Sequence, residues 1–182
     1  MAYAIHNSGR KMNTKKLTVK VALVLGTIFL ASSTTLAQGA LRSTDGRMVN
    51  LADAKGKIVV LSFGGTWLPM TSKELPALQK LADRYATRGV QVYWVSINSD
   101  KQSARNYAAD TDLQAFAQKN NVKLTILRDP EQQAYKSFGL DAVPTIVILN
   151  RDGKLIHKHI GFGTDQGEGY SEVIRELDQL LK

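Results

Sequence analysis

The sequence predicts an α/β protein in which helices cover both faces of one mixed β-sheet, a three-layer α/β/α sandwich with a small β-hairpin in front of it. Two observations carry this prediction. Apolar, β-rich segments at residues 58–63, 90–97 and 145–149 are separated by segments with helical periodicity. The last of them leads through a short turn into a further strand, which predicts a terminal β-hairpin, and a closing helix follows.

The first elements predict the hairpin extension and a central strand. Asp45-Gly46 lies between two short alternating segments within residues 41–51 and is a hairpin turn signal. After a polar turn, residues 58–63 (I-V-V-L-S-F) are nearly all apolar, as expected of a strand that is covered on both faces.

A helix is expected at about residues 71–88. Its apolar side chains recur at steps of three and four and would form one buried face: Leu75, Leu78, Leu81, Ala82 and Tyr85. Pro76 should kink this helix, because proline has no backbone N–H to donate. Gly89 is expected to end it before the strand at residues 90–97.

The second half of the chain continues the alternation of helices and strands. The elements expected there are a loop at 98–112, a helix at 113–120, a short strand at 122–127, strands at 145–149 and 154–160 around a turn at 150–153, and an amphipathic helix at 170–181. Asp129 is expected to cap a short helix that begins with Pro130 and runs to Phe138.

Residues 1–37 have the composition of a secretory signal peptide, with Met12 as an alternative start. Basic residues precede an apolar run at 21–31, and small residues up to Ala37 suit cleavage before Gln38. Eleven apolar residues are fewer than the roughly 20 that span a bilayer. We therefore expect an exported protein of the bacterial periplasm or cell envelope, with a single domain at residues 38–182. An uncleaved signal segment would be its only attachment to a membrane.

The charge and the cysteine count exclude several classes of function. Five of the 24 basic residues lie in residues 1–37, which contain no acid. The rest of the chain has 19 basic and 16 acidic residues. A charge of +3 over the remaining domain does not form a phosphate-binding stripe, so nucleic acid is not an expected partner. The chain has no cysteine, which excludes disulfides, thiolate metal sites and cysteine nucleophiles.

Three groups of residues carry a resemblance to a known family. They are Gly56-Lys-Ile-Val-Val-Leu-Ser-Phe63 with Gly65-Thr-Trp67, Pro69 and Lys73-Glu-Leu-Pro76; Asp129-Pro130 with Tyr135, Phe138-Gly139 and Val143-Pro144-Thr145; and Asn150-Arg-Asp-Gly153 with Gly161. Together they resemble the thioredoxin fold in its exported TlpA/ResA-like, redoxin (AhpC/TSA-related) form. That family has N-F-W-A-T-W-C-P-P-C-x-x-E-x-P at the first group. The matches extend over about residues 41–182.

The sequence departs from this family where the family's chemistry lies. The resemblance places the nucleophilic cysteine at Leu68 and the resolving cysteine at Thr71, so no catalytic residue is predicted. Glu74 matches the family's acid beside the redox pair, and burial there would raise its pKa. Pro144 matches the family's cis-proline. From the residues alone, Thr71 is expected to N-cap the helix, with Glu74 completing a capping box.

The remaining function of this loop is predicted to be binding. The segment Trp67, Leu68, Pro69 and Met70 would form an apolar surface, and such surfaces usually mark interaction sites. In the resembled family this surface holds an extended peptide against the backbone before the cis-proline, a form of strand addition. The predicted groove therefore also includes Val143, Pro144 and Thr145. Its predicted partner is another exported protein or an extended peptide, in a chaperone-like or scaffolding role.

Two alternatives stay open at this point. One is an oxidoreductase or antioxidant activity, as membership of the resembled family would imply. The other is a weak copper carrier that uses Met70 with His157 and His159, which alternate and so share one face of a strand. The plainer interpretation of the two histidines is a solvent-facing strand edge, and no cofactor or metal site is predicted.

Overall fold

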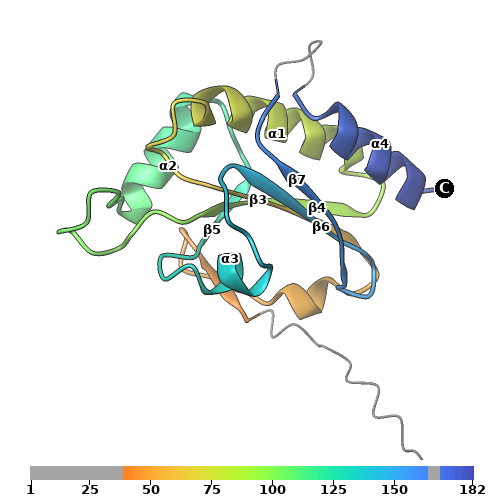
Figure 1. The fold of residues 1–182 in the computed structure, drawn as a ribbon, viewed down its shortest axis with the longest axis horizontal. Helices are drawn as coiled ribbons and strands as arrows, with labels where there is room; N and C mark the ends of the chain where they lie inside the picture. The colour runs from red at the N-terminus through yellow and green to blue at the C-terminus, as the bar shows by residue number, and fades with distance from the viewer. Residues whose placement is uncertain (1–38, 164–168) are drawn as a thin grey trace, which may run out of the picture. The chain divides into compact units, whose positions relative to one another are not determined.

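The computed structural model describes residues 39–163 and 169–182, in which seven strands form one mixed sheet in the order β2-β1-β5-β4-β3-β6-β7 (Figure 1). The strands are β1 (Leu41–Ser43), β2 (Met48–Val49), β3 (Ile58–Gly64), β4 (Val90–Ser96), β5 (Thr125–Arg128), β6 (Thr145–Leu149) and β7 (Leu155–Ile160). The three central strands β3, β4 and β5 run parallel, and β6 joins β3 antiparallel. This confirms the predicted mixed sheet.

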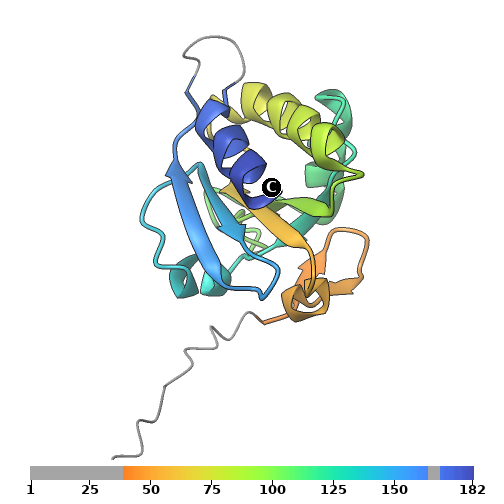
Figure 2. The ribbon, with the colours of Figure 1, turned by 90° about the vertical axis from the view of Figure 1, so that its right-hand side faces the viewer.

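Helices cover both faces of the sheet, as predicted. They are α1 (Thr71–Tyr85), α2 (Asp110–Lys119), α3 (Gln133–Ser137) and α4 (Ser171–Leu180), with a short 3-10 turn at Leu51–Ala54. Leu75 and Leu78 of α1, Leu113 of α2 and Leu177 of α4 belong to the apolar core on one face. The end of α3 packs its Phe138 into the core on the other face, and Figures 1 and 2 show α3 opposite α1 and α4.

The alternation of side chains along β3 explains why this strand is apolar throughout. Val60 faces the core beneath α1 and α4, whereas Val59, Leu61 and Phe63 face the core beneath α3. Every residue of β3 is buried. Because both faces of β3 are covered, the strand is held firmly in the sheet. The loop that follows is therefore positioned at the carboxyl end of β3.

Helix α1 ends at Tyr85, three residues before the predicted end, and the starts of α2 and α3 also differ from the predicted ones. Helix α2 begins at Asp110 rather than at 113, and Asp112 accepts a hydrogen bond from the Ala109 N–H. Helix α3 begins at Gln133 rather than at Pro130, because Gln132 takes a left-handed conformation. Asp129 still caps this helix from a distance by accepting from the N–H groups of residues 134 and 135.

The N-terminal extension is the predicted hairpin. Strands β1 and β2 pair antiparallel around Asp45-Gly46, and Gly46 has a φ of 87°, which glycine adopts without steric cost. The predicted signal segment, residues 1–37, lies outside the described residues. Within residues 39–163 and 169–182, no helix combines the length and the apolar character needed to cross a membrane.

Candidate functional site

The loop that joins β3 to α1 presents an apolar surface at the carboxyl end of β3. Trp67 is 42% exposed and Met70 39% exposed, Pro69 is exposed between them, and Leu68 is half-buried. Two exposed large apolar side chains in one short loop make this surface a candidate interaction site.

Thr71 does not N-cap α1, which corrects the expectation from the sequence. Met70 occupies the N-cap position without a side-chain hydrogen bond, and Thr71 is the first residue of the helix. Its side chain is fully buried, and the hydroxyl donates a hydrogen bond to the Gly65 carbonyl oxygen over 2.9 Å. The Leu68 N–H donates to the same oxygen over 3.2 Å. The hydroxyl of Thr71 therefore closes the loop onto its own first residues.

Gly65 also sets the position of the Trp67 ring. A Cβ atom built on Gly65 would lie 2.0 Å from a ring carbon of Trp67, so the ring covers the space that a side chain at position 65 would need. Asn98, which follows β4, holds the next residue: its amide oxygen accepts from the Thr66 N–H, and its amide nitrogen donates to the Thr66 hydroxyl. The exposed tryptophan thus rests on an anchored backbone.

The second predicted part of the groove lies beside this loop. In the antiparallel pair of β3 and β6, Phe63 is opposite Thr145, so the residues before β6 meet the end of β3. The Val143–Pro144 peptide bond is cis, as the resemblance implied. Pro144 and Thr145 are buried and Val143 is half-buried. No hydrogen bond within the described residues engages the backbone N–H or carbonyl of Val143.

A buried acid lies directly beneath the loop. Glu74 has no exposed surface, and its Oε1 accepts from the Ser62 hydroxyl over 2.6 Å and from the Tyr170 hydroxyl over 3.2 Å. Desolvation raises the pKa of Glu74 to about 7, although both hydrogen bonds act in the opposite direction. Instead of joining a capping box with Thr71, the side chain points into the core. The burial that the sequence predicted for this acid is confirmed.

Two polar atoms at this site, one of them the second oxygen of the acid itself, are buried without a hydrogen-bond partner in the described residues. They are Glu74 Oε2 and Trp94 Nε1. A Cβ atom at Gly64 would lie 3.2 Å from the indole nitrogen and 3.8 Å from the carboxylate oxygen, so both atoms border the same backbone position. An unpaired carboxylate oxygen is costly to bury when it is charged, which agrees with the raised pKa.

The positions that the resemblance assigns to the redox pair lie at the start of α1 and have none of the pair's chemistry. Leu68 is half-buried ahead of the helix, and Thr71 is buried at its first residue. Neither side chain has a sulfur that can attack or leave, and the chain contains no cysteine elsewhere. Glu74 beside them has no thiol whose pKa it could change.

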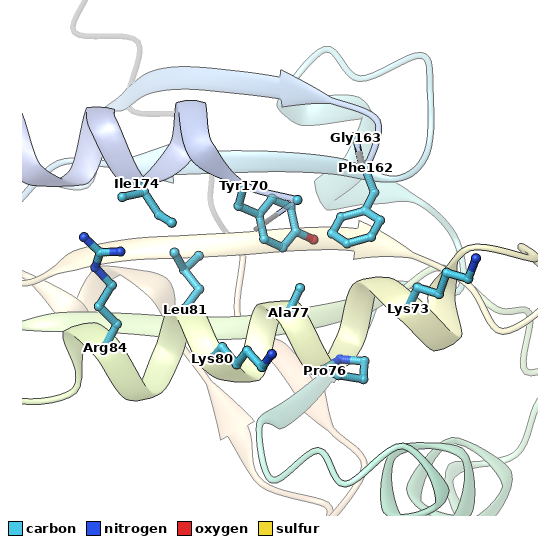
Figure 3. A pocket seen from close by; sticks show the side chains of 11 residues that line it. Lys73, Pro76, Ala77, Lys80, Leu81, Arg84, Phe162, Gly163, Tyr170 and Ile174 are labelled. Carbon is cyan, nitrogen blue, oxygen red and sulfur yellow. The ribbon is translucent and has the colours of Figure 1, made fainter. Parts of the chain in front are cut away.

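A groove of about 610 Å³ lies between α1 and the segment that leads into α4. Figure 3 shows Ala77 and Leu81 of α1 facing the rings of Phe162 and Tyr170 and the side chain of Ile174. Basic side chains from α1 also line it: Lys73, Lys80 and Arg84. The groove was not predicted from the sequence, because the residues of its two walls, such as Arg84 and Phe162, are 78 or more positions apart in the chain.

The two histidines lie on an edge strand, β7, as expected, but their side chains face α4 and not solvent. The side chains of His157 and His159 are only 20% and 18% exposed, and both lie within 4 Å of the Glu172 carboxylate on α4. The copper hypothesis joined them to Met70, which lies in the loop before α1. The third donor that the structure brings to the two histidines is Glu172 instead.

Three residues at these sites were missed in the sequence. Ser62 is the only hydroxyl in an apolar strand, a signal that could have marked a buried partner for Glu74. Tyr170 and Glu172 flank the start of α4, and nothing in their spacing relates them to residues that lie about 100 and 15 positions away.

Comparisons with known proteins agree with the fold and show the family. The model of the AhpC/TSA family matches residues 33–158. The thiol-disulfide oxidoreductase ResA of Bacillus thuringiensis strain Al Hakam is 30% identical over 131 residues, 71% of this chain and 70% of the relative. ResA of Bacillus subtilis strain 168 is 26% identical over 125 residues, 69% of this chain and 65% of the relative.

Two solved structures show the same fold. A Chlorobium tepidum protein assigned as thiol:disulfide interchange protein DsbE superposes with a TM-score of 0.66 at 24% identity, over 79% of this chain and 93% of its own. StoA from Bacillus subtilis superposes with a TM-score of 0.58 at 20% identity, over 79% of this chain and 96% of its own. The thioredoxin-like fold that the sequence predicted is confirmed.

Proposed function

The chain belongs to the AhpC/TSA family and is related to its ResA-type thiol-disulfide oxidoreductases, and on that premise we propose that it is a non-catalytic member that binds extended polypeptides. The observation that carries the proposal is the combination of an ordered, exposed apolar loop at residues 67–70 with two non-thiol side chains at the redox positions, Leu68 and Thr71.

The chemistry of the family cannot run on this chain alone. Thiol–disulfide exchange needs a thiolate that attacks a disulfide sulfur, and reduction of a peroxide by this family's route needs a thiolate that attacks oxygen. Leu68 offers only hydrocarbon at the position of the family's nucleophilic cysteine. Thr71 has a hydroxyl, but it donates to the Gly65 carbonyl in a buried position, and no base among the described residues is hydrogen-bonded to it.

The backbone before β6 supports binding by strand addition. Val143 has free backbone hydrogen-bonding groups and lies next to the loop that carries Trp67. A bound peptide in extended conformation would pair with Val143 and place its side chains against Trp67 and Met70. The peptide would gain main-chain hydrogen bonds from one side of the site and apolar contact from the other.

The groove beside α1 extends this surface and indicates the composition of the partner. Lys73 in the first turn of α1 lies at the end of the groove next to the loop, and Phe162 forms the apolar wall across from it (Figure 3). Lys80 continues the basic side along the helix. A segment that alternates apolar and acidic residues would match both the floor and the charge of the groove.

We propose further that the protein acts outside the cytoplasm, as a chaperone-like or scaffolding component of the cell envelope. The support is the basic and then apolar composition of residues 1–37. Its partner would be another exported protein. A domain at residues 38–182 would carry the binding surface.

The proposal is tested by affinity capture from the envelope fraction of the native host. Wild-type protein and the Trp67→Ala variant serve as paired baits, and an insulin-reduction assay is run on the same preparations. We expect proteins that are captured by the wild type and depleted with the variant, and no acceleration of insulin reduction by either. Disulfide turnover by the purified, cysteine-free chain would contradict the proposal, as would equal capture by both baits.

A further inference from the structure

Strand β7 and helix α4 bring three metal-ligating side chains together at a place remote in sequence from the redox positions. His159 Nδ1 lies 3.0 Å from Glu172 Oε2, and His157 Nε2 lies 3.9 Å from Glu172 Oε1. One ligand atom from each of the three residues lies within 4.8 Å of the other two.

The register of the sheet explains this convergence. His157 is opposite Ile148 and His159 opposite Ile146, and both isoleucines belong to the core beneath α1 and α4. The register of the pair shifts next to Ile148, so that Leu155 packs into the core of the other face. The two imidazoles therefore project toward α4, whose first turn carries Glu172.

The environment of the cluster differs from that of a surface ion pair. His157 Nε2 is buried and has no hydrogen-bond partner in the described part of the chain. The His159 ring packs edge-on against the Tyr170 ring at a centroid distance of 6.5 Å, which fixes its orientation. Glu172 is 48% exposed, so its carboxylate can adjust while the two rings stay in place.

We propose that His157, His159 and Glu172 bind one divalent transition-metal ion of the Zn²⁺ type. Two imidazoles and one carboxylate form a known ligand set for Zn²⁺, with the fourth position left to water. Bonds of about 2.1 Å in tetrahedral geometry place ligand atoms about 3.4 Å apart. The donors already lie within 4.8 Å, so a small movement of the Glu172 side chain closes the site.

A bound ion would connect the last strand of the sheet to the last helix. β7 pairs only with β6 among the described strands, and α4 continues from a residue that lines the groove, Tyr170. Coordination of both elements would stabilise the folded state in proportion to the logarithm of the metal concentration above the dissociation constant. This inference does not depend on the proposed peptide binding, since none of the three ligands belongs to that surface.

The test uses the full chain, with Zn²⁺ followed by calorimetry and Co²⁺ followed by its visible absorption. We expect one ion per chain, and an affinity that falls about tenfold or more in each of three variants: His157→Ala, His159→Ala and Glu172→Gln. The matched controls are Glu176→Gln on the same helix and His6→Ala, the remaining histidine. Both should bind as the wild type does.

A second measurement covers the case in which a variant unfolds. The electron paramagnetic resonance spectrum of the wild-type chain with one equivalent of Cu²⁺ should show coupling to two nitrogen nuclei, and Ca²⁺ should not compete, because it prefers oxygen ligands. Absence of stoichiometric Zn²⁺ binding would overturn the proposal. So would undiminished binding by a folded His157→Ala/His159→Ala double variant.

Discussion

The hydroxyl of Tyr170 lies 3.2 Å from Glu74 Oε1 and donates a hydrogen bond to it, which joins the first turn of α1 to the residue before α4. The same oxygen accepts from Ser62 of β3 over 2.6 Å. Three elements that meet beneath the exposed loop are thus held by one buried carboxyl group. Tyr170 also lines the groove, so the protonation state of Glu74 is coupled to a wall of the proposed binding surface.

Stability should fall as the pH rises from about 5 to 8. Burial raises the pKa of Glu74 to about 7 in the folded state, from 4.5 when the residue is exposed. Between these values the unfolded chain has released the proton and the folded chain still holds it, so a rise in pH favours unfolding. The loss should be about 3 kcal/mol in the free energy of unfolding. Urea unfolding at pH 5, 6, 7 and 8 measures it.

Glu74→Gln is the control for this pH dependence. The amide does not titrate, yet its oxygen can accept from Ser62 and Tyr170, so the variant should lose most of the slope and exceed the wild type in stability at pH 8. Arg47 lowers the pKa of Asp45, and Arg88 lowers the pKa of Asp178. Both carboxyl groups therefore change the stability only below about pH 4, outside the range from pH 5 to 8. Identical slopes for wild type and variant would refute the assignment to Glu74.

Tyr170→Phe should destabilise the protein more at pH 8 than at pH 5. The variant removes a hydrogen bond to a carboxylate at the higher pH and to a neutral carboxyl group at the lower one. We expect losses of about 2 and about 1 kcal/mol, respectively, and a further rise in the pKa of Glu74. Denaturant unfolding at the two pH values measures the two losses of stability. A loss that does not change with pH would contradict a hydrogen bond from the Tyr170 hydroxyl to a carboxyl group that ionises between the two pH values.

Gly65→Ala should displace the Trp67 ring without unfolding the domain. The new methyl group needs the space in which the ring lies, and the ring can swing outward because it ends a flexible side chain. We expect weaker peptide binding and a red shift of tryptophan emission. The shift would report on Trp67, because Trp94 stays buried and unaffected. Gly39→Ala is the matched control, because no described residue other than its chain neighbours has an atom within 4 Å of a Cβ at that position. An unchanged spectrum would contradict the described contact.

Restoring the two thiols should restore redox chemistry. In a Leu68→Cys/Thr71→Cys variant the first sulfur would be half-exposed and the second buried at the start of α1, where the helix N-terminus favours a thiolate. We expect an intramolecular disulfide and catalysis of insulin reduction, with the Leu68→Cys single variant inactive as the control. If the double variant forms no disulfide or does not turn over, the loop differs from the family's by more than two sulfur atoms.

The fold was predictable because its signals are local. The uniformly apolar β3, the periodic apolar face of α1 and the Asp45-Gly46 turn each specify one element, and their order leaves few ways to build a sheet. Boundaries were less predictable where a side chain caps a helix from several residues away. Asp129 is the example, because it caps α3 from four residues before the helix begins. An N-cap normally directly precedes the helix, so the predicted start was placed at Pro130.

The candidate site was predictable only in part, because its partners come together through the sheet. Leu68 and Thr71 could be assigned from neighbouring residues, whereas the contact of Glu74 with Tyr170 spans 96 positions. The sequence placed Thr71 at the helix cap, but burial favoured its hydrogen bond to Gly65 instead. Likewise, the alternation of His157 and His159 predicted a shared face, but only packing against α4 adds Glu172.

The central claim, binding without thiol chemistry, is tested most directly with an unfolded polypeptide whose cysteines are reduced and carboxymethylated. Fluorescence anisotropy measures its affinity for the wild-type protein, for Trp67→Ala, and for Met48→Ala, which removes a 62% exposed side chain in the edge strand β2. The account predicts saturable binding that weakens about tenfold or more in Trp67→Ala and is unchanged in Met48→Ala. Absence of binding, or equal affinity for all three proteins, would contradict it.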